Sequence, residues 1–506
     1  MPILSAHPPR DACATLRPVS EAPTSPRIGS AAPAAATEAL SATELAGGTG
    51  GRVVRDAGRP IRGAAVDSRL VRPGELFVAL RGERTDGHEF LGEAVAAGAA
   101  GLLVATELDS AALARLGDVT IVQVPDPLLA LQQIASGWRA RFSPLVVGVT
   151  GSIAKTSTKE AIATVLAARG ATLRSEGNQN NEIGLPLTLL RLTRDDVHAV
   201  LEMGMYVGGE IARLAELARP SIGVVTSVLG VHLSRIGSIE AVEDAKAELV
   251  EALPDDGVAV LNADDPRVLR MAARTRARAL TYGFATEADI RAEGVRSLGS
   301  AGMAFRLVAG PATRHSGSVE VRIPPLGRLS VHNALAGAAV GVAVGMSLDS
   351  IAAALSAGWT APHRGQLLRA GNVSIVDDSY NASPASVIAA LELLAGLEGR
   401  HVAALGEMLE LGEEGAAGHR EVGRAAAAAC ALLVTVGEGA AEIAVGARLA
   451  GMDPAEIVAT TDRAGALAAL LDRLVPGDVV LVKASRGAEL EWHVEALEKA
   501  LVEAPQ

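Results

Sequence analysis

The chain contains very few aromatic residues and very few cysteines. Aromatic side chains make up 2% of the 506 residues, and the two cysteines are Cys13 and Cys430. A core built mainly from Ala, Val and Leu favours helices packed on parallel strands over an aromatic-rich β-sandwich. Two distant cysteines exclude a disulfide framework and a zinc site. They fit a reducing compartment, so we expect the protein to be cytoplasmic.

The sequence also lacks an excess of positive charge and a long apolar run. The 46 Lys and Arg residues are outnumbered by 58 Asp and Glu residues, and the formal net charge is −12. We therefore expect no nucleic-acid partner, and an anionic substrate must be bound by local cations or a metal. No apolar run is long enough to span a bilayer and the N-terminus lacks the pattern of a secretory signal, so we expect no membrane insertion.

Length and local composition predict three folded domains after a tail. A chain of this length corresponds to about three domains of ordinary size. Residues 1–38 are rich in Ala, Pro and Ser and are expected to be disordered. The domains are placed at 39–142, 143–364 and 365–506. Strand-like runs alternate with helical stretches in the last two, which predicts an α/β protein with a small mixed domain followed by two doubly wound sheets.

The segment GVTGSIAKTSTKE (148–160) is close to a phosphate-binding loop. Gly148, Lys155 and Thr156 match the pattern G-x-x-x-x-G-K-[ST], but Ala154 replaces the glycine before the lysine. A β-branched run precedes the loop and an amphipathic helix follows it, which is the context that such a loop requires. On the pattern alone, a simple βα turn is an equally good interpretation. If the loop needs a positive φ at Ala154, the methyl group costs about 1 kcal/mol.

Polar residues end three further predicted strands. Glu202 ends VHAVLEMG, His232 follows SIGVVTSVL, and Asp377 and Asp378 end VSIVDD. Each has an ordinary alternative interpretation, as a capping acid, a loop residue or part of a turn. Since α/β sheets bind ligands at the carboxyl ends of their strands, we expect these residues to converge at one switch point.

Ten stretches, in order from about residue 45 to the C-terminus, make the chain resemble the Mur ligase family. These are ATP-dependent amide ligases that build the peptidoglycan precursor peptide. The resemblance implies a UDP-binding first domain, a central P-loop ATPase domain with a mostly parallel sheet, and a Rossmann-like C-terminal domain. The stretches are DSRLVRPGELFVALRGERTDGHEF, GSIAKTSTKE, GNQNNEIGLPLTLL, LEMG, SIEAVEDAKAELVEAL, LNADDP, HNALAG, VDDSYNASPAS, LGEMLELGEEGAAGHREVG and LVKASRG.

Three of these stretches resemble the branch of the family that joins D-Ala-D-Ala to the UDP-N-acetylmuramoyl-tripeptide: GNQNNEIGLPLTLL, YNASP and LGEMLELG. The implied reaction transfers the γ-phosphate of ATP to a substrate carboxylate, and an amine then attacks the acyl phosphate. Two alternatives stay open: a related ligase that uses another amine, and a nucleotide-binding homologue without turnover. Members of the family commonly act as monomers, so a monomer is expected.

The resemblance also implies the catalytic and metal-binding residues. Lys155 and Thr156 hold the ATP phosphates and a first Mg²⁺, and Glu202 and His232 complete the metal sites. Lys246 matches a lysine that reacts with CO₂ to form a carbamate, which suits a second Mg²⁺. From spacing alone, Lys246 is an exposed helical lysine paired with Glu243.

The remaining implied residues bind ATP and the substrates. Arg364 and Ala484 lie in stretches that depart from the family pattern, APHRG instead of a Pro-Gly-Arg turn and VKASRG instead of KGSR. For the residues at the UDP end, turn and capping chemistry is the alternative. The implied ATP-binding residues are Gly151, Ser152, Lys155, Thr156, Ser157, Asn333, Arg364 and Asp378. The implied substrate-binding residues are Ser68, Arg69, Asp86, His88, Asn178, Asn181, Asn381, Lys483, Ser485 and Arg486.

Overall fold

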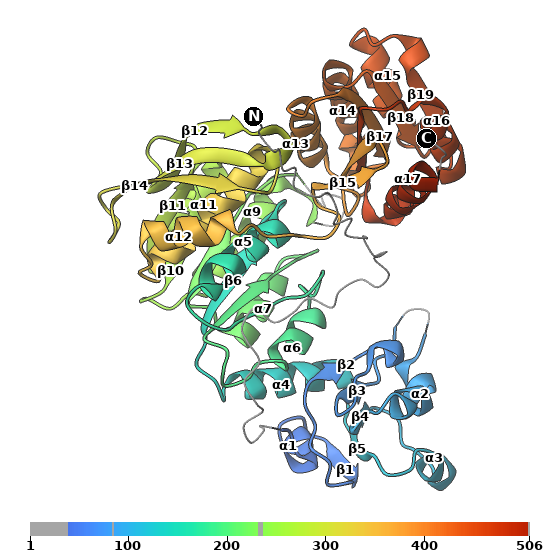
Figure 1. The fold of residues 1–506 in the computed structure, drawn as a ribbon. Helices are drawn as coiled ribbons and strands as arrows, with labels where there is room; N and C mark the ends of the chain where they lie inside the picture. Colours follow the sequence, from blue (N-terminus) through green and yellow to red (C-terminus); the bar gives the residue numbers. More distant parts are fainter. Residues whose placement is uncertain (1–38, 83–84, 231–235, 504–506) are drawn as a thin grey trace, which may run out of the picture.

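Three successive α/β units, each built on one sheet, make up the computed structural model (Figure 1). It describes residues 39–82, 85–230 and 236–503, so the tail predicted for 1–38 lies outside the described residues. The predicted α/β class with three sheets is confirmed. In the described part of the chain, no helix is both long and apolar enough to cross a membrane.

The N-terminal unit has a five-stranded sheet in the order β1-β5-β4-β3-β2, with β1 antiparallel to β5 and the other pairs parallel. Its strands are short because turns with Gly and Pro interrupt the apolar runs. The elements are α1 (Ala42–Gly47), β1 (Arg52–Arg55), β2 (Ala64–Ala65), β3 (Leu76–Val78), α2 (Leu91–Ala96), β4 (Gly101–Val104), α3 (Ser110–Arg115), β5 (Thr120–Gln123) and α4 (Pro127–Arg139).

Helix α4 joins the first unit to the central one. It begins at Pro127, where the Asp126 carboxylate accepts a hydrogen bond from the Leu128 N–H at 2.8 Å. At its other end, the Trp138 indole donates to the Leu192 carbonyl at 3.0 Å. Leu131 of α4 lies in a hydrophobic core that contains residues of both units, so the two units share part of one core.

The central unit has nine strands in the order β14-β13-β12-β11-β10-β9-β6-β8-β7. Neighbours from β7 to β12 pair in parallel, and β12, β13 and β14 form an antiparallel extension. The strands are β6 (Leu145–Thr150), β7 (Thr172–Arg174), β8 (His198–Glu202), β9 (Ile222–Val225), β10 (Val258–Asn262), β11 (Arg278–Gly283), β12 (Ile290–Ser297), β13 (Met303–Ala309) and β14 (Gly317–Ile323).

Helices cover both faces of the central sheet. On one face α5 packs tightly against α11, and small residues allow the close approach: a Cβ on Gly341 would lie 2.9 Å from Val165. The other face forms the core shared with α4. The helices are α5 (Lys155–Ala167), α6 (Gly184–Leu189), α7 (Glu210–Ala218), α9 (Ile239–Glu251), α10 (Pro266–Arg270), α11 (Gly327–Ala343) and α12 (Leu348–Ser356).

The C-terminal unit is a six-stranded sheet in the order β15-β16-β20-β17-β18-β19, parallel except for β15. Separate cores cover its two faces, as expected for a doubly wound sheet. The elements are β15 (Gln366–Ala370), β16 (Val373–Asp377), α13 (Pro384–Ala395), β17 (Arg400–Gly406), α14 (Gly415–Ala429), β18 (Leu432–Val436), α15 (Ala441–Leu449), β19 (Ile457–Thr460), α16 (Arg463–Arg473), β20 (Asp478–Lys483) and α17 (Glu491–Glu503).

Candidate active site between the central and C-terminal units

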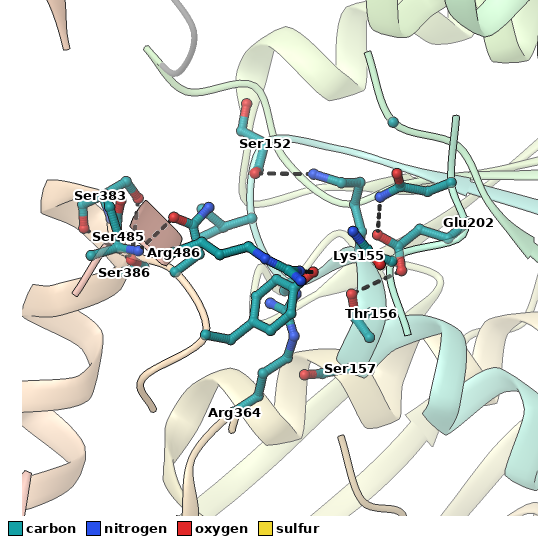
Figure 2. A pocket seen from close by; sticks show the side chains of 18 of the residues that line it. Ser152, Lys155, Thr156, Ser157, Glu202, Arg364, Ser383, Ser386, Ser485 and Arg486 are labelled. Atoms are coloured by element: carbon teal, nitrogen blue, oxygen red, sulfur yellow. Dashed lines mark hydrogen bonds between the residues drawn. The ribbon is translucent and has the colours of Figure 1, made fainter. Parts of the chain in front are cut away.

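A cavity of about 640 Å³ lies between the central and C-terminal units, and the described residues that line it come from these two units. The central unit contributes the loop after β6, the segment before α6, Glu202 and the start of α11. The C-terminal unit contributes Arg364, the segment after β16 and the segment after β20. Figure 2 shows side chains from both units pointing into the same space.

The loop between β6 and α5 is fixed by its contacts with the segment that follows β9. The Ile153 N–H donates to Ser227 Oγ at 3.2 Å, and the Thr226 hydroxyl donates to the Ile153 carbonyl at 2.7 Å. Gly151 has a φ of +147°, and a Cβ there would lie 1.9 Å from Thr226 Oγ1. Ala154 has a φ of 65°, the left-handed conformation that the missing glycine would adopt without strain. The backbone therefore keeps the shape of a phosphate loop in spite of the alanine.

Lys155 opens α5 and points back over the loop. Its Nζ donates to the Gly151 carbonyl at 2.7 Å and to the Ser152 carbonyl at 3.3 Å, the latter visible in Figure 2. Burial lowers the pKa of Lys155, the nearby Arg364 charge lowers it further, and Glu202 opposes both. The ammonium is thus held beside a second cation, an arrangement that an anionic ligand such as a phosphate would stabilise.

Glu202, at the end of β8, is buried; its carboxylate accepts two hydrogen bonds and its N–H donates a third. The Thr156 hydroxyl donates to Oε2 at 2.8 Å and the Asn180 amide to Oε1 at 2.8 Å, while the Glu202 N–H donates to Ser175 Oγ at 3.1 Å. These contacts bring together a hydroxyl, an amide and a carboxylate at the head of the phosphate loop. Such oxygen donors are the ligands that Mg²⁺ prefers.

Lys246 is buried on α9, so the interpretation of an exposed lysine paired with Glu243 is wrong. Its side chain is 2% exposed and has no hydrogen-bond or ion-pair partner among residues 39–82, 85–230 and 236–503. Glu243 pairs instead with Arg270 at 2.8 Å. Burial holds the pKa of Lys246 well below its ordinary value, and the Lys155 charge adds to this. A neutral amine is the form that can react with an electrophile.

Asn333, on α11, is buried at the wall of the cavity. Its side-chain oxygen accepts a hydrogen bond from the Thr158 hydroxyl at 2.9 Å, which links α11 to α5. The amide N–H₂ of Asn333 can donate to a ligand in the cavity.

The C-terminal wall contains three cations that the sequence placed in the site. The Lys483 ammonium pairs with Asp378 at 2.6 Å and donates to the Asn381 carbonyl at 2.8 Å. Arg364 and Arg486 both lie against the ring of Tyr380, with their guanidinium carbons 4.0 Å and 5.0 Å from its centroid. This wall can therefore bind negative groups opposite the phosphate loop.

Ser485 supports this wall through the backbone. Its hydroxyl oxygen accepts a hydrogen bond from the Leu409 N–H at 2.9 Å, and its own N–H donates to the Glu407 carbonyl at 3.0 Å. Asn178 and Asn181 line the opposite side of the cavity, and Asn181 also caps α6 by accepting the Gly184 N–H at 2.9 Å.

The residues proposed for the UDP end lie in the N-terminal unit, outside the cavity. Both nitrogens of the His88 ring are engaged, with Asp86 at 2.5 Å and with the Ala105 N–H at 2.9 Å. Ser68 donates to Glu93 at 3.1 Å, and Arg69 pairs with Asp67. Asp86, His88 and Arg69 make the turn or capping contacts of the alternative interpretation, whereas Ser68 makes a contact far along the chain. The role of all four toward UDP stays a prediction.

The expected convergence of the polar strand ends is found in part: Glu202 and Asp378 line one cavity, but they do not share the switch point of one sheet. Glu202 ends a strand of the central sheet, whereas Asp377 and Asp378 end β16, a strand of the C-terminal sheet. They approach the cavity from opposite walls because the chain crosses to a second sheet between them. Asp377 is not among the described residues that line the cavity, and it accepts a hydrogen bond from the Ser379 hydroxyl at 2.6 Å. His232 lies outside the described residues.

Two residues that line this cavity, Asn180 and Tyr380, and one that supports its wall, Thr158, were not predicted from the sequence. Asn180 is the member of GNQNN that reaches Glu202, Thr158 holds Asn333, and Tyr380 carries the two arginines. Asn180 and Tyr380 stand inside motifs that the sequence had already marked, GNQNN and YNASP. The motif shows that a segment matters, but which of its side chains faces the cavity depends on the turn that the backbone takes.

Family models cover most of the chain. They match residues 60–139 (Mur ligase family, catalytic domain), 149–341 (Mur ligase middle domain) and 363–486 (Mur ligase, glutamate ligase domain). The chain is 40% identical over 472 residues to the UDP-N-acetylmuramoyl-tripeptide–D-alanyl-D-alanine ligase of Mycobacterium bovis, with 85% of this chain and 91% of the relative covered. It is 38% identical to the ligase of that name from Escherichia coli, with 86% and 93% covered.

A solved structure shares the three-unit fold. The MurF ligase from Thermotoga maritima, in complex with ADP, superposes with a TM-score of 0.75 at 28% identity, over 88% of this chain and 99% of that chain. An ADP complex of a related protein agrees with the phosphate loop described above.

Proposed function

Because the chain belongs to the Mur ligase family, we propose that it is an ATP-dependent ligase that joins D-Ala-D-Ala to the UDP-N-acetylmuramoyl-tripeptide in peptidoglycan precursor synthesis. The observation that carries the proposal is one cavity with a phosphate loop on one wall and a cationic substrate wall on the other. Relatives with that name match it over most of their length.

The reaction requires two chemical steps in one cavity. A carboxylate is a poor electrophile, so transfer of the γ-phosphate of ATP to a carboxylate oxygen first gives an acyl phosphate and ADP. The amine of the dipeptide attacks the acyl carbon, the C–O bond to phosphate breaks, and the products are an amide, inorganic phosphate and a proton. Lys155 and Arg364 would neutralise the transferred phosphate, and the two walls would hold both reactants in reach of each other.

Donors for Mg²⁺ stand beside the phosphate loop. The Thr156 hydroxyl and the Glu202 carboxylate are hard oxygen ligands within hydrogen-bond distance of each other, and they fit this ion. When bound, Mg²⁺ would offset charge on the phosphate oxygens. The roles of Thr156 and Glu202 as ligands, and of His232 beside them, belong to the proposal.

Lys246 is proposed to carry a carbamate. Reaction of its neutral amine with CO₂ forms an N–C bond and releases one proton, which turns a buried amine that has no partner among the described residues into an anionic oxygen ligand. We expect ADP release to fall in CO₂-depleted buffer and to recover on addition of bicarbonate. Lys246→Ala should be inactive and insensitive to bicarbonate. Equal rates of the parent enzyme with and without CO₂ would contradict the carbamate.

The test of the function is a coupled assay of ADP release with the UDP-linked tripeptide as acceptor. D-Ala-D-Ala should support turnover, and single amino acids should not. Lys155→Ala should lower the rate by at least a hundredfold, because a phosphate charge would lose its main counter-charge. ADP release with a single amino acid and none with D-Ala-D-Ala would favour a ligase for another amine, and no ATP-dependent amide formation would favour a nucleotide-binding homologue without turnover.

Location and assembly complete the proposal. ATP and the UDP-linked acceptor are reagents of the cytoplasm, so the reaction is placed there. The monomeric state stays a prediction, which light scattering of the purified chain would decide.

A further inference from the structure

Two guanidinium groups share one aromatic ring at the wall of the cavity. The guanidinium carbon of Arg364 lies 4.0 Å from the centroid of the Tyr380 ring, and that of Arg486 lies 5.0 Å away. Arg486 Nη1 also donates to the Tyr380 hydroxyl at 2.6 Å. In Figure 2 the Arg364 and Arg486 side chains extend toward each other on the side of the cavity that faces Lys155.

The two arginines come from separate parts of the chain. Arg364 stands in the segment that connects the central and C-terminal units, and Arg486 begins a short 3-10 helix (Arg486–Ala488) after β20. Two like charges repel each other unless a group between them offsets the repulsion. The face of an aromatic ring carries partial negative charge and attracts guanidinium groups, so Tyr380 can hold both at once.

The position of Tyr380 is itself fixed. Its N–H donates to the carbonyl of His363, the residue before Arg364, at 3.1 Å. The His363 ring contacts the buried Asp377 carboxylate at 2.7 Å, and Asn381, the residue after Tyr380, accepts from Lys483 at 2.8 Å. The ring is therefore anchored to the interdomain segment on one side and to β20 on the other.

We propose that Tyr380 is a positioning residue that presents Arg364 to the nucleotide and Arg486 to the incoming dipeptide, and so links the two subsites of the ligase. The inference rests on the function proposed above. The ring face acts on Arg364, since stacking is the contact that holds it. The hydroxyl acts on Arg486, which donates a hydrogen bond to it in addition to a longer ring contact. We call the contact of the ring face with Arg364 the Arg364 arm and the hydrogen bond of Arg486 to the hydroxyl the Arg486 arm. Substitutions of Tyr380 can separate the two.

The experiment compares Tyr380→Phe, which keeps the ring and removes the hydroxyl, with Tyr380→Leu, which removes both. Binding of AMP-PNP in the presence of Mg²⁺, measured by calorimetry on the full chain, reports the Arg364 arm without turnover. We expect Tyr380→Leu to weaken this binding about fivefold and Tyr380→Phe to stay within twofold of the parent. In the ligase assay, both variants should raise the KM for D-Ala-D-Ala about fivefold or more, through the lost hydrogen bond to Arg486.

A control separates positioning from loss of structure. In an Arg364→Ala background, Tyr380→Leu should no longer affect AMP-PNP binding, because the ring acts on the nucleotide through that arginine. Thermal unfolding midpoints of all variants show whether they are folded. Unchanged or tighter AMP-PNP binding by folded Tyr380→Leu would overturn the proposal. The ring would then have no effect on nucleotide binding, or it would keep Arg364 away from the nucleotide. An equal loss with Tyr380→Phe would also overturn it.

Failure of the proposed function has a different signature. If the parent enzyme forms no amide with D-Ala-D-Ala, the ligase proposal and the Arg486 arm fall together, while AMP-PNP binding still decides the Arg364 arm. If the parent is active and the KM for the dipeptide is unchanged in Tyr380→Phe, the ligase stands and the Arg486 arm is wrong.

Discussion

At the scale of the residue, Ala154 keeps a left-handed backbone in which alanine is strained. Its φ of 65° costs about 1 kcal/mol relative to glycine, while glycine at this position would cost about 0.5–1 kcal/mol through the greater freedom of the unfolded chain. We therefore expect Ala154→Gly to change the free energy of unfolding by less than about 1 kcal/mol and to change ATP affinity only modestly. Chemical denaturation and nucleotide titration check this. A gain in turnover of several hundredfold would mean that the natural loop is impaired.

His493, on α17, should make stability depend on pH. Its side chain is fully buried, and burial lowers its pKa below the ordinary value of about 6.5. The folded state thus binds the proton less well than the unfolded state. The contribution of His493 to the free energy of unfolding is complete above pH 6.5, and it is lost as the pH falls through the lowered pKa.

The measurement is the urea midpoint at pH 7.5 and at pH 5.5. We expect the parent to lose more stability between these values than His493→Leu, whose side chain does not titrate. Parallel losses in the two proteins would show that His493 does not contribute.

Some site residues could be predicted from the sequence and others could not. Lys155 and Thr156 follow from a local pattern, because the loop and the helix that position them are contiguous in the chain. The burial of Lys246 could not be read from its helix, since acidic neighbours such as Glu243 suggest an exposed face. The packing of α9 against the central sheet decides it, and that contact is long-range.

At the scale of the element, Ala484 packs directly against β17. A Cβ on Gly406 would lie 2.5 Å from the Ala484 Cβ, an atom that cannot rotate away. We expect Gly406→Ala to lower the free energy of unfolding by about 1–3 kcal/mol through overpacking. The double variant Gly406→Ala with Ala484→Gly adds a methyl group on β17 and removes the one it would collide with. It should therefore recover most of the lost free energy of unfolding. Urea denaturation measures both, and equal destabilisation of the single and double variants would contradict the contact.

Buried parallel strands were the most predictable elements. Runs such as PLVVGVT and DVVLVKAS carry β-branched residues that a two-sided sheet buries, and they form β6 and β20. The antiparallel extension β12–β14 was not predicted. Its strands alternate buried and exposed residues, and nothing local to them shows that they would join the edge of the central sheet.

At the scale of the whole molecule, the residues proposed to bind UDP lie in a different unit from the residues that line the cavity. The residues proposed for UDP stand in the N-terminal unit (Figure 1), whereas the residues that line the cavity belong to the other two units. Closure of the units is therefore expected when the nucleotide and the UDP-linked substrate bind together. We expect the radius of gyration from small-angle X-ray scattering to decrease with both ligands and to change less with ADP alone. An unchanged radius would contradict closure.

The number and class of the units could be predicted, but not the position of the cavity between them. Strand and helix patterns repeat along the chain and report each sheet in turn. The charge interaction between Lys155 and Arg364 and the packing of α4 on the central core connect residues far apart in sequence, so no local sequence pattern predicts them.

The order of the cavity walls along the chain has a consequence for biosynthesis. The phosphate loop is translated early, and Lys483, Ser485 and Arg486 come last, just before the closing helix α17. A ribosome-bound chain can thus complete its nucleotide loop long before the opposite wall exists. A nascent chain that stops before β20 would have the phosphate loop but not the residues proposed to receive the dipeptide, so ligase activity would require the segment that follows β20.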